Sequence, residues 1–111
     1  MGLYGNNRRG KGRARREFAV KIKTAAGQKQ VYTVDVSTGG VRIGAPLLRL
    51  SLGETVEITI DHAGTSHTYS GQISRLDGMV RINRISRDVS AYFVRIVDEQ
   101  FTEYIKKNFS V

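Results

Sequence analysis

The stretch "DVSTGG" at residues 35–40 combines side chains that suit the recognition of a polar ligand. Asp35 and Ser37 are two residues apart in an extended segment, so both point to the same face, opposite Val34 and Val36. Gly39 and Gly40 allow the backbone to turn tightly and a ligand to approach it closely. The carboxylate, the hydroxyl and the open backbone therefore share one surface. The alternative is that Asp35 and Ser37 only cap a turn through their own backbone bonds.

A cationic run precedes this stretch. Residues 1–16 carry six basic and no acidic side chains, whereas the whole chain has a formal net charge of +8. This segment is rich in Gly and Arg and poor in apolar residues, so we expect residues 1–17 to be flexible until an anion orders them. Its basic residues are Arg8, Arg9, Lys11, Arg13, Arg15 and Arg16.

A guanine nucleotide would use all of these groups. A carboxylate can accept hydrogen bonds from N1 and N2 of guanine, and an arginine fork matches guanine O6 and N7 or a phosphate. Arginine planes also stack on purine faces. The residues therefore favour a guanine nucleotide that carries more than one phosphate charge.

The rest of the chain predicts strands that would position these groups. Apolar and polar residues alternate with a period of two in about six or seven short segments, which favours an all-β antiparallel barrel or sandwich. The alternation predicts Tyr32, Val34 and Val36 on one core-facing side of their strand. Asp77-Gly78 is a strong hairpin dipeptide and predicts a turn there. The expected strands include residues 18–23, 30–36, 41–43, 56–61, 67–76, 79–85 and 91–97.

The last segment changes period and predicts a C-terminal helix over residues 98–109. Its apolar residues fall at helical spacing, with acids at the start and lysines at the end, which matches the helix dipole. The expected buried stripe consists of Phe101, Tyr104, Ile105 and Phe109.

Composition excludes several classes of function. The 111 residues suffice for one domain, and the absence of cysteine excludes disulfides and thiolate sites. No apolar run approaches the roughly 18 residues that cross a bilayer, so we expect a cytoplasmic protein without membrane insertion. No P-loop or nucleophile elbow is present, so we expect no enzymatic activity. His62 and His67 flank a polar turn and are expected to be solvated rather than metal ligands.

The order of the motifs resembles the PilZ domain family, whose pattern is RxxxR followed by (D/N)xSxxG. Arg9 and Arg13 match the first element, and Asp35, Ser37 and Gly40 match the second. The resemblance implies a small antiparallel barrel with a helical element, formed here by residues 18–111, and a ligand clamp at residues 1–17. It implies a bacterial receptor for cyclic di-GMP, with no other cofactor. An effector protein downstream would control motility, exopolysaccharide or virulence.

The implied ligand contacts are Arg8, Arg9, Arg13, Asp35, Ser37, Gly39 and Gly40. In this family the second arginine usually lies very close to the first strand, whereas residues 14–17 intervene here before Phe18. Lys11 with Arg15 is therefore an alternative pair, and Arg16 can assist.

Two alternative functions remain. A small basic barrel is also typical of nucleic-acid-binding modules, although the expected core positions of most aromatic residues disfavour this. Other members of the family act as adaptors without binding nucleotide, generally where both motifs are missing.

Overall fold

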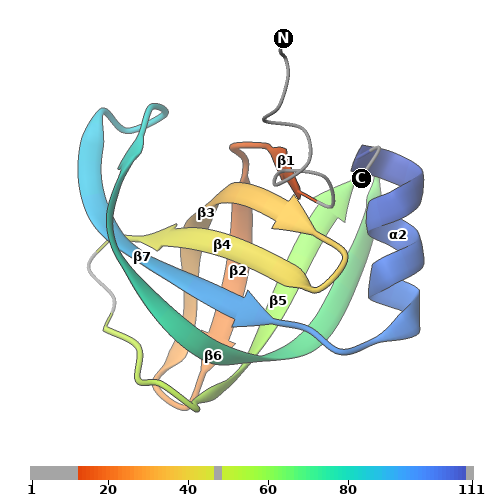
Figure 1. Ribbon diagram of the computed structural model, residues 1–111, viewed down its shortest axis with the longest axis horizontal. Helices are drawn as coiled ribbons and strands as arrows, with labels where there is room; N and C mark the ends of the chain where they lie inside the picture. The colour runs from red at the N-terminus through yellow and green to blue at the C-terminus, as the bar shows by residue number, and fades with distance from the viewer. Residues whose placement is uncertain (1–12, 47–48, 110–111) are drawn as a thin grey trace, which may run out of the picture.

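The computed structural model describes residues 13–46 and 49–109, which form a closed antiparallel sheet and one helix (Figure 1). Each strand pairs with its neighbours in the order β2, β5, β6, β7, β4 and β3, and β3 pairs again with β2. The predicted small barrel with a C-terminal helix is confirmed. The elements are β1 (Arg13–Arg15), β2 (Ala19–Thr24), β3 (Gly27–Ser37), β4 (Gly40–Ala45), β5 (Thr55–His62), β6 (Thr65–Ile82), β7 (Arg87–Arg95) and α2 (Glu99–Phe109).

Strands β1 and β2 lie end to end along one edge of β3, because β1 pairs with residues 35–37 and β2 with residues 27–32. The sheet thus begins at Arg13, before the domain boundary predicted between residues 17 and 18. The Thr33 hydroxyl bonds to the backbone of the segment that connects β1 to β2. It accepts a hydrogen bond from the Phe18 N–H at 3.0 Å and donates one to the Arg16 carbonyl at 2.6 Å.

Replacing Thr33 with valine should lower the free energy of unfolding by about 1–3 kcal/mol, because two backbone groups lose their buried partner. Thr33 is fully buried, so water cannot replace the hydroxyl. Urea denaturation measures the change. The matched control is Thr59→Val on β5, whose hydroxyl bonds to the Thr68 hydroxyl at an exposed site. Equal losses in both variants would contradict this role of Thr33.

The interior of the barrel is filled by aliphatic side chains, and α2 packs against the main core with its apolar stripe. Phe101, Tyr104, Ile105 and Phe109 are all buried, as their spacing predicted. The Phe18 ring stacks on Phe109, with 5.8 Å between ring centroids. Burial raises the pKa of Tyr104 above its ordinary value. The helix is therefore part of the core of the domain.

The alternation predicted for β3 is wrong in its first half. Val31 and Thr33, rather than Tyr32, are the fully buried residues there. A register shift between Thr33 and Asp35 in the β3–β4 ladder then changes which residues of the strand face the interior. Val36 therefore belongs to the main core. Val34 packs instead in a second, smaller cluster. A bulge inserts one extra residue in a strand, and an alternation pattern cannot show it.

The turn predicted at Asp77-Gly78 is also wrong. Strand β6 continues to Ile82, and these two residues lie at a register shift between Leu76 and Met79. Gly78 has a φ of 76°, which suits a bulge as well as a hairpin turn. The real turn spans residues 83–86. We call residues 79–90 the β6–β7 arm; Figure 1 shows it extending past β4.

The arm is fixed at two places. Its residues Ile82 and Val89 pack with Val34 in the smaller cluster. At its tip, the Glu17 carboxylate accepts hydrogen bonds from the N–H groups of Asn83 and Arg84, at 3.0 and 2.8 Å. The segment between β1 and β2 is thus joined to a turn far along the chain.

Candidate functional site

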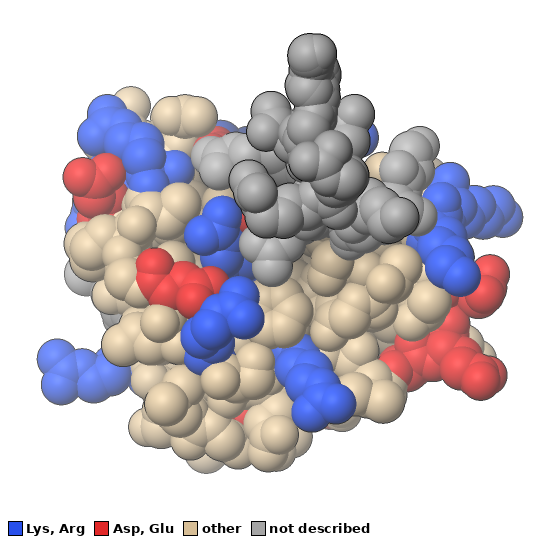
Figure 2. Space-filling model, in the orientation of Figure 1, with Lys and Arg blue, Asp and Glu red and all other residues tan. Residues whose placement is uncertain are grey.

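The residues singled out from "DVSTGG" lie on the outer face of the barrel, at the end of the β3–β4 hairpin. In the ladder, Asp35 is opposite Arg42 and Ser37 is opposite Gly40. Directly opposite residues of an antiparallel pair share a face of the sheet. Figure 2 shows Lys and Arg side chains spread over this side of the molecule, with fewer acidic ones among them. An anion would meet a mainly positive surface.

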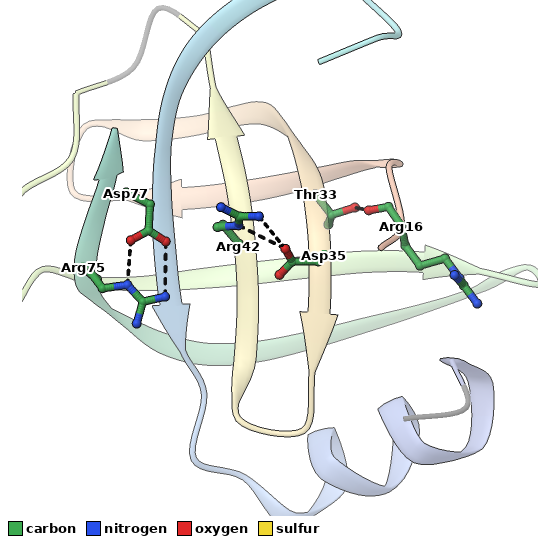
Figure 3. Close-up of polar contacts among 6 residues, drawn as sticks. All are labelled: Arg16, Thr33, Asp35, Arg42, Arg75 and Asp77. Atoms are coloured by element: carbon green, nitrogen blue, oxygen red, sulfur yellow. Dashed lines mark hydrogen bonds and ion pairs between the residues drawn. The ribbon is translucent and has the colours of Figure 1, made fainter. Parts of the chain in front are cut away.

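Asp35 forms an ion pair with Arg42. The Arg42 Nη2 and Nε both donate to Asp35 Oδ2, at 2.8 and 3.1 Å, and Figure 3 shows the two side chains side by side. The side chain of Asp35 is 7% exposed and that of Arg42 is 26% exposed. The pair therefore holds a largely buried carboxylate in place, while part of the guanidinium is accessible.

Sequence reasoning did not single out Arg42 as a partner of Asp35. The signal that could have found it is the length of the turn. The short turn at residues 38–39 places residue 42 directly opposite residue 35. The bulge at Val34 begins one residue farther from the turn. Register across a hairpin is set by the turn.

Ser37 holds the turn together. Its hydroxyl accepts a hydrogen bond from the Gly39 N–H and donates one to the Gly40 carbonyl, both at 3.3 Å. The capping alternative thus describes Ser37, and the Asp35 carboxylate accepts hydrogen bonds from the Arg42 guanidinium. The turn is also joined to α2, because the Thr102 hydroxyl donates to the Thr38 carbonyl at 3.1 Å.

The two glycines of the turn differ in their surroundings. A Cβ on Gly40, where φ is 154°, would lie 2.1 Å from the Val94 carbonyl oxygen and 2.8 Å from Phe93 Cζ. A Cβ on Gly39 would meet nothing within 4 Å. Gly40 is therefore required by the close approach of β7, and Gly39 leaves open space at the surface.

The structure places some of the predicted arginines. Arg8 and Arg9 lie outside the described residues, as does Lys11. Arg13 is the register partner of Ser37, and Arg15 is the register partner of Asp35. Because β1 starts at Arg13, this arginine does lie at the first strand, which removes the apparent departure in spacing.

Arg16 belongs to a different environment. Its guanidinium lies 5.9 Å from the centroid of the Phe109 ring on α2. Figure 3 shows its side chain extending away from the Asp35–Arg42 pair. Arg16 therefore contributes to helix packing.

The two histidines contact an aromatic ring of the helix. The ring of His67 lies 4.6 Å from that of Tyr104, and the ring of His62 lies 5.8 Å from it. Within the part of the chain that the structure describes, no group of three or more His, Cys, Asp or Glu residues could hold a metal ion. No helix in residues 13–46 and 49–109 is long and apolar enough to cross a membrane.

Comparisons with known proteins agree with this arrangement. The family model of the PilZ domain matches residues 7–99, which include both motifs. No curated protein sequence is detectably similar to the chain. Among solved structures, the fold is similar to the PilZ domain of CeSA from a cellulose-synthesizing bacterium. That match has a TM-score of 0.61 and 20% sequence identity, and it covers 88% of this chain and 95% of the other. Since the family model matches most of the sequence and the barrel has the same fold, the chain belongs to the PilZ domain family.

Proposed function

We propose that this domain is a cytoplasmic receptor for cyclic di-GMP, which binds between the arginines of residues 8–13 and the outer face at Asp35 and Ser37. The family is one of cyclic di-GMP receptors, and its domain binds and regulates rather than catalyses. The observation that carries the proposal is the β1–β3 register, with Arg13 opposite Ser37. This register brings the end of the RxxxR motif to the DxSxxG motif.

Each group has a chemical role in this proposal. The Asp35 carboxylate accepts hydrogen bonds from guanine N1 and N2, and the arginines pair with phosphates or with guanine O6 and N7. Arg42 positions Asp35, because it holds one of the two carboxylate oxygens. Gly39 leaves room for the ligand to approach the turn.

The signal is a change in order rather than a chemical reaction. In this proposal the predicted clamp, residues 1–17, of which residues 1–12 lie outside the described part of the chain, closes over the bound dinucleotide and presents a new surface to an effector protein. Ordering a segment costs conformational entropy, so the ion-paired hydrogen bonds must offset that cost before binding is tight. The neighbouring turn is bonded to α2, which supports a response that extends beyond the ligand site.

Isothermal titration with cyclic di-GMP tests the proposal, with cyclic di-AMP and GTP as controls at physiological salt. We expect selective binding of cyclic di-GMP. Absence of heat with every nucleotide would overturn the receptor proposal and favour an adaptor.

Replacing Arg13 with alanine should weaken cyclic di-GMP binding by at least about tenfold, since a charge-assisted hydrogen bond contributes roughly 1.5–3 kcal/mol. The matched control is Arg87→Ala at an exposed position of β7. Both variants should keep the circular dichroism spectrum of the parent protein. Unchanged affinity of the Arg13 variant would move the cationic contact to another arginine.

Nucleic acid is the less favoured ligand. Binding of single strands uses exposed aromatic rings on which bases stack. Here Tyr69, Tyr92, Phe101 and Tyr104 are all buried. Among the described residues, the aromatic side chains thus serve mainly the core.

A further inference from the structure

A second polar arrangement lies on β6, near the candidate site. The guanidinium carbon of Arg75 is 5.0 Å from the centroid of the Phe93 ring and lies over it. Arg75 Nε and Nη2 donate to Asp77 Oδ1 and Oδ2, at 2.6 and 3.2 Å. The side chain of Arg75 nevertheless remains 52% exposed, whereas that of Asp77 is 15% exposed. The Phe93 ring thus lies against one face of the guanidinium, and Asp77 accepts hydrogen bonds from its edge. Much of the guanidinium surface remains accessible to solvent.

Arg75 and the candidate site lie in one row that runs across four neighbouring strands. In successive ladders, Asp35 is opposite Arg42, Arg42 is opposite Phe93, and Phe93 is opposite Arg75. Figure 3 shows the Asp35–Arg42 and Arg75–Asp77 pairs on either side of β7. Neighbouring strands are about 4.8 Å apart, so three strand spacings put Arg75 roughly 14 Å from Asp35. One extended ligand can reach from one pair to the other.

The local backbone explains why Arg75 is so well fixed. Register shifts flank it, one between Ile73 and Arg75 and one between Leu76 and Met79. Bulges of this kind redirect side chains. The hydrogen bonds that Arg75 donates to Asp77 also raise the pKa of its guanidinium. A side chain ordered before binding loses less entropy when it binds.

We propose that the Arg75 guanidinium, supported by Phe93, is a stacking platform for the second base of the bound cyclic dinucleotide. A planar guanidinium stacks on the face of a purine, and its positive charge also attracts the nearby phosphates. Asp35 then recognises one guanine while Arg75 stacks on the other. This inference rests on the proposed function and adds a residue outside both sequence motifs.

The test exchanges the planar group for a point charge. Arg75→Lys keeps the positive charge but removes the flat surface, so we expect cyclic di-GMP affinity to fall by about tenfold, the order of one base-stacking contact. Arg87→Lys is the matched control and should bind like the parent protein. Both variants replace exposed side chains, and circular dichroism checks that they fold.

The possible results separate the two proposals. Binding by the parent protein with a weakened Arg75→Lys variant and an unchanged Arg87→Lys variant supports the platform. Equal affinity of the parent and Arg75→Lys proteins would overturn the platform while leaving the receptor function in place. A parent protein that does not bind cyclic di-GMP would overturn both.

Discussion

Replacing Asp35 with alanine should weaken cyclic di-GMP binding by about 100-fold. Each hydrogen bond to a charged group contributes roughly 1.5–3 kcal/mol, and the carboxylate would accept two from one guanine. The substitution also removes the partner of Arg42, whose Nη2 is 2.8 Å from Asp35 Oδ2, and so leaves that guanidinium without its anchor. Titration calorimetry of the parent and variant proteins measures the loss.

The choice of nucleotide makes this prediction specific. Adenine lacks the donor pair that a carboxylate recognises in guanine, so cyclic di-AMP binding should change much less. Asp88→Ala is a suitable control, because Asp88 also faces an arginine, Arg81, but at 3.9 Å and in an exposed position. If Asp35→Ala reduces the affinity for both dinucleotides by the same factor, Asp35 supports the hairpin without reading the base.

Replacing Gly40 with alanine should destabilise the domain by about 3 kcal/mol, in the range of an overpacked interior. The added Cβ would lie 2.1 Å from the Val94 carbonyl oxygen and 3.1 Å from the Arg95 Cα. Both atoms are backbone, so β4 and β7 would have to separate, and the ladder that joins Gly40 to Arg95 would be disturbed. Thermal and urea unfolding measure this loss.

The neighbouring glycine provides the control for that experiment. Gly39→Ala adds the same methyl group where nothing lies within 4 Å, so its effect on stability should be within about 0.5 kcal/mol. Equal stability of the two variants would show that the approach of β7 does not require glycine at residue 40. The final glycine of the DxSxxG motif therefore has a packing role that is separable from ligand contact.

The sequence predicted the barrel, the helix and the position of the DxSxxG residues, because these depend on local periodicity and on short motifs. Alternation is sufficient to find a strand, and the spacing of Phe101, Tyr104, Ile105 and Phe109 is sufficient to find a helical stripe. These predictions required no knowledge of which strands are neighbours.

The features that the sequence did not predict depend on pairing between strands. The bulge at Val34 and the bulge at Asp77-Gly78 exist only relative to β4 and β7. Arg42 is brought opposite Asp35 by the β3–β4 register, and Arg75 is brought over Phe93 by the β6–β7 register. Asp-Gly also serves both turns and bulges, so the dipeptide alone could not distinguish them.

The hydrogen bonds of Glu17 indicate at what stage of biosynthesis this part of the domain can finish folding. Its carboxylate binds amides of Asn83 and Arg84, which follow it by 66 and 67 residues. Closing so large a loop is entropically unfavourable until intervening contacts have formed. A ribosome must therefore have delivered β6 before Glu17 can make these bonds. The connection between β1 and β2 is therefore synthesised early but acquires these hydrogen bonds late. A nascent chain that ends before residue 83 would contain the arginines without the bonds that hold Glu17.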